Sequence, residues 1–182
     1  MKKRTHRGRI WVLLDRNGKL IEDIDTDQIY HNAFLHITEV SEMGKHALGN
    51  LEGWKDFAGK AAPGDILVAG RNFGAGSSRQ QAVDCFIALK IGAILTPSFA
   101  SIYFRNAVNS GLPVLKSARI EHLVAGSKLE SGDEVDVDFL SGRALNVSKG
   151  VSFEVEPMGV VQREIFEAGN LFAFGRSLDR RD

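Results

Sequence analysis

Residues 64–82 read GDILVAGRNFGAGSSRQQA, and they decide the fold class of this 182-residue chain. The apolar residues that follow the Pro63-Gly64 turn predict a short buried strand over residues 65–70. Glycine and serine then dominate residues 72–78, which predicts a loop. Apolar side chains recur at helical spacing over residues 79–91. The stretch therefore predicts a strand, a glycine-rich loop and a helix in direct succession.

The pattern on either side of this stretch predicts an α/β fold. Strands are expected at residues 9–14, 93–96 and 113–116, with a helix over residues 99–108 between the last two. Towards the C-terminus the period changes to strict alternation, which predicts strands at residues 134–139, 143–147 and 152–156, followed by a helix over residues 158–168. We expect one domain, residues 1–182, built on a mixed sheet or sheets with flanking helices.

Composition limits the classes of partner. The 23 basic and 23 acidic side chains cancel, whereas nucleic acids and anionic membrane surfaces favour a basic excess. The first apolar run, residues 10–14, ends at Asp15, too early for a signal peptide or a membrane span. We therefore expect a cytoplasmic protein that binds neither nucleic acid nor membrane.

The chain has a single cysteine, Cys85, within the predicted helix 79–91. We expect a buried structural thiol, because one cysteine cannot form an internal disulfide or hold a metal cluster alone. His31, His46 and His122 lack ligand spacing and are expected at the surface. No metal site is predicted on this chain.

The glycine-rich loop carries the candidate chemistry. Gly76 allows a tight turn, and the free N–H groups of a helix start attract an anion. Ser77 or Ser78 can cap the following helix, and Arg79 can hold a carboxylate with two parallel hydrogen bonds. These residues predict a carboxylate or phosphate cradle, although an ordinary helix entry with a solvated arginine fits the same pattern. The run lacks the Gly-Lys-Ser/Thr of a Walker loop, and it lacks the third glycine of a dinucleotide-binding fingerprint.

Three ordered blocks, residues 25–29, 64–82 and 97–113, resemble the small subunits of isopropylmalate isomerases in the aconitase superfamily. The resemblance implies a three-layer β/β/α swivelling domain of aconitase type. It also implies a hydro-lyase made of two kinds of subunit, a heterodimer or heterotetramer, in which a large subunit holds a four-iron four-sulfur cluster through three cysteines. This chain would hold no cofactor, in keeping with its single cysteine. The implied reaction converts 2-isopropylmalate into 3-isopropylmalate, in leucine biosynthesis, by removing and returning water.

The resemblance also implies a role for each loop residue. Ser77 matches the base that removes the proton next to a carboxylate of the hydroxy-dicarboxylate substrate. Gly76 and Ser78 would bind substrate from the same loop, Ser78 through its backbone N–H or hydroxyl, and Arg79 would bind a substrate carboxylate. Asp27 matches an aspartate near the active site, which we expect to orient a histidine or arginine of the large subunit.

A second segment, Phe34, Leu35, His36 and Ile37, matches a tetrad that sorts substrates by their side group. Relatives frequently have an arginine where this chain has His36, which either binds a carboxylate when protonated or lines an apolar pocket. We expect an apolar pocket for a branched alkyl group. The small subunit of a homoaconitase, a dimethylmalate dehydratase or a citraconase is the alternative within enzymes.

A non-catalytic binding module of the same fold is the alternative outside enzymes. The intact run from Ser77 to Arg79 argues against it, since a decayed site has no reason to keep both the base and the anion clamp. A further departure from relatives is Gln80-Gln81, where a glutamate commonly follows the arginine. That change removes a carboxylate near the site but leaves the base in place.

Overall fold

A single mixed sheet of seven strands forms the centre of the structure, a computed structural model that describes residues 4–178. The strand order is β4-β3-β2-β1-β5-β6-β7. The strands are β1 (Thr5–Val12), β2 (Ile66–Val68), β3 (Ala93–Thr96), β4 (Val114–Lys116), β5 (Glu134–Asp138), β6 (Arg143–Asn146) and β7 (Val151–Glu154).

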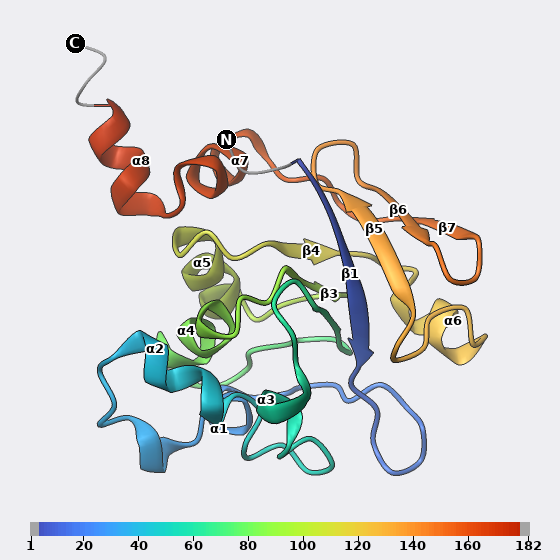
Figure 1. Cartoon of the computed structure of the whole chain (residues 1–182), viewed down its shortest axis with the longest axis horizontal. Coiled ribbons are helices and arrows are strands. Elements are labelled where there is room, and N and C mark those ends of the chain that lie inside the picture. The colour runs from blue at the N-terminus through green and yellow to red at the C-terminus, as the bar shows by residue number, and fades with distance from the viewer. Residues whose placement is uncertain (1–3, 179–182) are drawn as a thin grey trace.

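The long strand β1 joins a parallel half of the sheet to an antiparallel half. Its C-terminal part pairs in parallel with β2, from Ile10 to Val12, and β3 and β4 continue that parallel half. Its N-terminal part, from Thr5 to Arg9, pairs antiparallel with β5, and β6 and β7 continue as a meander. In Figure 1, β1 runs through the middle of the molecule, with most helices on one side and β5–β7 on the other.

Two cores, one on each face of the parallel strands, give the fold its layers. Leu67 and Ile94 face a core that also contains Val83 and Phe86 of the first long helix. Their neighbours face a second core shared with the meander strands; its members include Ile66, Val68, Leu95, Val135, Val137 and Phe153. Helices, parallel strands and antiparallel strands therefore stack as three layers, and the predicted β/β/α arrangement is confirmed.

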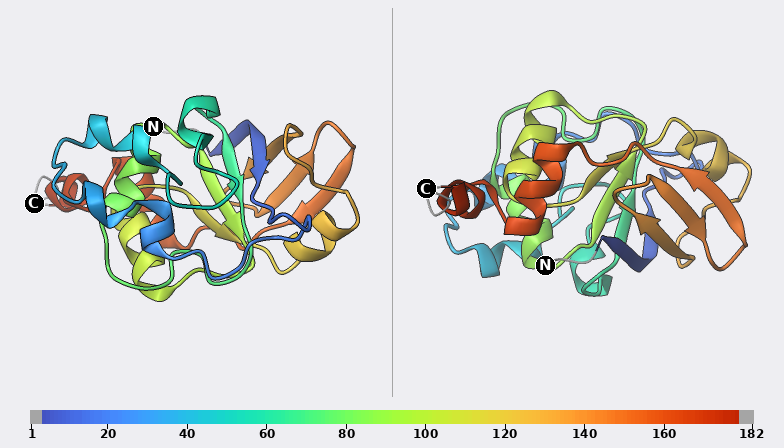
Figure 2. Two further views of the ribbon diagram at one scale, coloured as in Figure 1. Left: turned by 90° about the horizontal axis from the view of Figure 1, so that it is seen from below. Right: turned by 90° about the horizontal axis from the view of Figure 1, so that it is seen from above.

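The helices lie mainly at the end away from the meander (Figure 2). The longest of them are α4 (Gln81–Ala88), α5 (Ser101–Asn109), α7 (Val160–Ala168) and α8 (Leu171–Leu178), and α6 (Ile120–Ala125) lies near the meander. Short turns of helix connect β1 to β2: α1 (Thr26–Ile29), η1 (Asn32–Phe34), α2 (Val40–Met43), η2 (Gly44–His46) and α3 (Phe57–Lys60).

Most expected elements are present, and each difference has an identifiable structural cause. The first strand was expected over residues 9–14 but begins at Thr5, because β5 supplies hydrogen-bond partners to residues 5–9. The helix over 158–168 ends before Gly169 as predicted, with a φ of 106° there. A second helix, α8, follows at once because the Asn170 side chain accepts a hydrogen bond from Ala173 N at 2.8 Å. Residues 1–3 of the basic N-terminus lie outside the described residues.

Gly74, at the start of the glycine-rich loop, cannot be replaced without strain. Its φ is 82°, and a Cβ there would lie 2.1 Å from Cγ of Tyr103. That tyrosine cannot move aside, since its side chain is 2% exposed and its hydroxyl donates to Ala82 O at 3.2 Å. The loop therefore approaches α5 as closely as a glycine allows.

We predict that Gly74→Ala lowers the free energy of unfolding by about 2–4 kcal/mol, which combines backbone strain with overpacking. Gly53→Ala is the matched control, because Gly53 has the same φ of 82° with nothing within 4 Å of the added Cβ. It should lose only about 1–2 kcal/mol from strain. Denaturant unfolding measures both, and equal losses would show that the contact with Tyr103 is unimportant.

Candidate active site

The serine loop, residues 72–80, runs beside the segment 24–27 that precedes and opens α1. Thr26 N donates to Ala75 O at 2.9 Å, and Gly74 N donates to Ile24 O at 2.8 Å. The Thr26 hydroxyl, on a residue only 3% exposed, donates to Ser77 O at 2.9 Å. Two of the three blocks that carry the family resemblance therefore form one unit in space.

Asp25 gives the acidic segment its shape. Its carboxylate accepts hydrogen bonds from Asp27 N and Gln28 N, both at 2.8 Å, while the Gln28 side chain accepts from Asp25 N at 2.9 Å. This reciprocal capping box starts α1 and satisfies N–H groups that a helix start leaves unpaired. The carboxylate of Asp25 is thus occupied by backbone N–H groups, whereas the carboxylate of Asp27 binds other partners.

The Asp27 carboxylate joins the two segments through an ion pair with Arg79. Nη1 of Arg79 donates to Asp27 Oδ1 at 2.6 Å and to Tyr30 O at 3.1 Å. Asn32 N donates to the same carboxylate oxygen at 2.9 Å, and Asn50 Nδ2 donates to Oδ2 at 2.9 Å. The hydrogen bond from Arg79, above all, holds the pKa of Asp27 below its usual value, although partial burial opposes this.

The Arg79 guanidinium keeps one edge available for a ligand. Its side chain is 18% exposed, and no hydrogen bond within residues 4–178 uses Nε or Nη2. These two nitrogens form the fork that binds a carboxylate through parallel hydrogen bonds. The interpretation of Arg79 as a solvated helix-entry arginine is therefore wrong, and the clamp remains available.

Gly76, Ser77 and Ser78 are exposed on the outer part of the loop. Gly76 has a φ of 84°, which suits glycine. Within residues 4–178 no hydrogen bond involves the Ser77 hydroxyl, whereas Ser78 Oγ accepts a long one, 3.4 Å, from Asn106 Nδ2. The loop presents the Ser77 hydroxyl to the space outside this chain.

The prediction that a serine caps the helix is wrong. Helix α4 begins at Gln81, with Gln80 at the N-cap and no side-chain cap hydrogen bond. The two residues before Gln80 are held in a non-helical path, because Ser77 O is bonded to Thr26 and Arg79 is paired with Asp27. The serines are therefore not used in helix capping.

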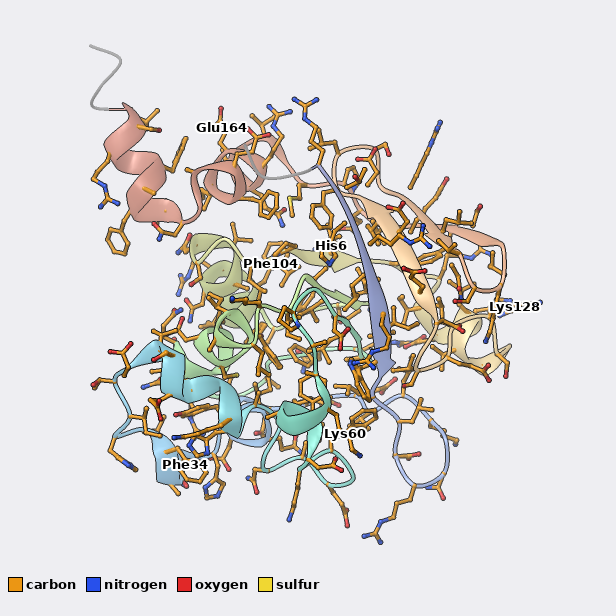
Figure 3. The ribbon with its side chains drawn as sticks, viewed as in Figure 1. His6, Phe34, Lys60, Phe104, Lys128 and Glu164 are labelled. Atoms are coloured by element: carbon orange, nitrogen blue, oxygen red, sulfur yellow. The ribbon has the colours of Figure 1, made fainter. Side chains whose placement is uncertain are left out.

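The tetrad lies next to this unit but its members differ in exposure. Phe34 and Ile37 are half-buried against the helical core. Leu35 and His36 are exposed, and the His36 ring nitrogen Nδ1 lies 3.0 Å from Ala33 O. Figure 3 labels Phe34 on the segment at the end of the molecule opposite Lys128.

Sequence reasoning missed three residues that build the site, Thr26, Tyr30 and Asn50. Thr26 lies between the two aspartates and is buried at the first position of α1. The contributions of Tyr30 and Asn50 arise from packing between distant segments. No local pattern in the sequence points to them.

An iron–sulfur cluster does not fit the donors of this chain. Such clusters are held by thiolates, and the one thiol, Cys85, is fully buried and donates to Ala82 O at 3.6 Å. Burial raises the pKa of this thiol far above its usual value. No group of three His, Cys, Asp or Glu side chains suited to a metal ion occurs among the described residues.

The prediction of Cys85 as a buried structural thiol is confirmed.

Helices within residues 4–178 are all too short or too polar to span a bilayer.

The fold and the serine loop define an aconitase-type C-terminal domain. The family model for the aconitase C-terminal domain matches residues 17–119. The small subunit of 3-isopropylmalate dehydratase from Caldicellulosiruptor bescii is 39% identical over 90% of this chain and 95% of its own length. Small subunit 1 of the same enzyme from Archaeoglobus fulgidus is 40% identical over 96% of this chain and 99% of its own length.

A solved structure gives the same result. The 3-isopropylmalate dehydratase chain of Methanocaldococcus jannaschii is 32% identical, with a TM-score of 0.81, and the match covers 97% of this chain and 98% of that one. The chain belongs to the family of 3-isopropylmalate dehydratase small subunits.

We predict that Asp27→Asn destabilises the chain in a pH-dependent way. Because the folded-state pKa of Asp27 lies below its unfolded value of about 3.9, its ion pair stabilises the fold above that pH and is lost as pH falls through the lower folded value. The difference in free energy of unfolding between wild type and variant should be constant from pH 7 to 5. It should shrink below about pH 4. A difference that stays constant down to pH 3 would contradict this assignment.

Proposed function

We propose that this chain is the small subunit of a hydro-lyase that converts 2-isopropylmalate into 3-isopropylmalate by dehydration and rehydration, as part of leucine biosynthesis. The observation that carries the proposal is the exposed Ser77, whose hydroxyl has no partner among residues 4–178, on the same loop as Arg79 with its free guanidinium edge. Family membership supports the same reaction, since the relatives are known as 3-isopropylmalate dehydratase small subunits.

Ser77 is the proposed base. Its Oγ takes the proton from the carbon next to a substrate carboxylate, the neighbouring carbon loses its hydroxyl, and water returns in the opposite sense. A serine alkoxide is costly in water, so it needs positive charge and N–H dipoles in a site from which water is excluded. Arg79 and the loop amides before α4 supply these, and a covering partner would supply the exclusion.

The chemistry of the leaving hydroxyl belongs, on this proposal, to a large subunit. A four-iron four-sulfur cluster on that subunit would act as a Lewis acid, and the buried Cys85 explains why this chain cannot hold it. Exposure of the serine loop supports a partner at this surface. We propose that residues 1–182 act as one domain, that they swivel over the large subunit in a heterodimer or heterotetramer, and that the complex is cytoplasmic.

The side group of the substrate is assigned to the tetrad. Leu35 is apolar and exposed on the segment that begins beside Asp27 and Arg79, and the half-buried Phe34 and Ile37 support it from the core side. This composition suits an isopropyl group, whereas a third carboxylate would have only His36 within the tetrad. Turnover of isopropylmalate, homoaconitate, citrate and dimethylmalate by the reconstituted complex tests the choice, and preference for a tricarboxylate would favour the homoaconitase alternative.

We predict that Ser77→Ala lowers kcat by about 10²–10⁴-fold, the range of general-base catalysis, and leaves folding and partner affinity unchanged. Ser152→Ala, at an exposed position of β7 far from the loop, is the control and should keep wild-type turnover. Activity of the reconstituted complex and a binding titration with the large subunit measure both effects. Wild-type turnover in the Ser77 variant would show that another group is the base.

We predict that Arg79→Lys raises KM about tenfold, equivalent to ~1.4 kcal/mol, with a smaller change in kcat. Lysine keeps the charge but replaces the fork of Nε and Nη2 by a single ammonium group. Steady-state kinetics with isopropylmalate checks this. An unchanged KM would mean that the free edge of Arg79 does not contact the substrate.

A further inference from the structure

The tetrad segment, residues 30–37, is held at its first residues by the site itself. Asn32 N donates to Asp27 Oδ1 at 2.9 Å, and Arg79 Nη1 donates to Tyr30 O at 3.1 Å. The guanidinium proposed to bind substrate is therefore bonded to the start of the segment proposed to select the substrate. A shift in one is transmitted to the other through these bonds.

The middle of the segment is held by an aromatic stack. The rings of Phe34 and His46 lie 3.8 Å apart between centroids, with an angle of 20° between their planes. Tyr30 packs edge-on against both rings, at 6.4 Å from Phe34 and 6.0 Å from His46, and its hydroxyl donates to Phe34 O at 3.1 Å. These contacts fix Phe34 relative to the buried Tyr30.

His46 lies on a short helical turn that is packed against α4. It ends η2, and a Cβ added at Gly44, the first residue of that turn, would lie 3.2 Å from Ala88 Cβ and from Leu89 Cδ2. Hence η2 packs directly on α4, the helix that follows the serine loop. Burial, and to a lesser degree the charge of Lys45, lower the pKa of His46, which favours a neutral ring suited to stacking at neutral pH.

Only part of the tetrad is then available to a substrate. The Phe34 ring is used in the stack, and Ile37 is half-buried. Leu35 and His36, between them, are exposed. The expectation that His46 is a simple surface residue is wrong, because its ring is half-buried between Phe34 and Tyr30.

We propose that His46 is a positioning residue for substrate selection: its ring holds Phe34, and through Phe34 it sets where Leu35 and His36 stand relative to Arg79. His46 touches no substrate on this account. The inference rests on the proposed function for its kinetic consequence, whereas the positioning of the segment can be measured in the chain by itself.

The kinetic test compares His46→Ala with His46→Phe in the complex with the large subunit, using 2-isopropylmalate and citrate as substrates. His46→Ala should raise KM for isopropylmalate about three- to tenfold, in line with the loss of one aromatic pair, with kcat nearly unchanged. The ratio of kcat/KM values for the two substrates should fall by the same factor. His46→Phe keeps a flat ring and should restore both. His122→Ala, at an exposed position of α6, is the control and should match wild type.

Two results would overturn the proposal: a wild-type substrate ratio in His46→Ala, or a His46→Phe variant that behaves like His46→Ala. If His46→Ala does not fold, Phe34→Leu removes the same stack from its other side and should shift the ratio similarly. Where both fold, their double mutant should show less than additive effects, because both remove one contact.

Hydrogen exchange of the isolated chain separates this inference from the proposed function. The amide of Ile37, which donates to Phe34 O at 3.0 Å, should exchange faster in His46→Ala and at the wild-type rate in His46→Phe. If exchange changes in this way but the wild-type complex does not turn over isopropylmalate, the proposed function is wrong and the positioning role of His46 stands. Unchanged exchange with normal turnover would remove the positioning alone.

Discussion

The contact between the serine loop and the segment 24–27 is the constraint on which the site depends. An exposed, glycine-rich loop has little intrinsic preference for one conformation, because glycine loses more conformational freedom on ordering than any other residue. Here the buried Thr26 supplies two hydrogen bonds to the loop, and Asp27 holds Arg79. The sheet supports both partners, since one segment follows β1 and the other follows β2.

The Asp27–Arg79 pair is suited to a site that is completed by another subunit. Both side chains keep some exposure in the isolated chain, so water screens part of their attraction and limits what the pair contributes to stability. When a partner excludes water, the same charges interact more strongly with each other and with a bound carboxylate. A loop that is held by these bonds but only partly covered therefore fits a subunit that supplies half of an active site.

Local pattern was sufficient to predict the strand–loop–helix unit and the alternating strands of the meander, whereas the candidate base rests on the family resemblance. It failed where distant segments decide the outcome. The start of α4 depends on the ion pair between Arg79 and Asp27, which lie 52 residues apart. Likewise, the role of His46 depends on the packing of η2 against α4, and β1 extends to Thr5 because of β5. The spacing of apolar residues predicts which helices and strands form, whereas contacts between distant elements decide where each begins and ends and what it packs against.

The most direct measurement is an anaerobic titration of this chain into its cluster-bearing large subunit, with turnover of 2-isopropylmalate as the readout. The account predicts no turnover by either subunit alone, and activity that rises with added chain until a fixed stoichiometric ratio is reached. Turnover by one subunit alone would contradict the claim that the site is shared. So would a cluster-loaded complex that binds this chain and leaves isopropylmalate unchanged.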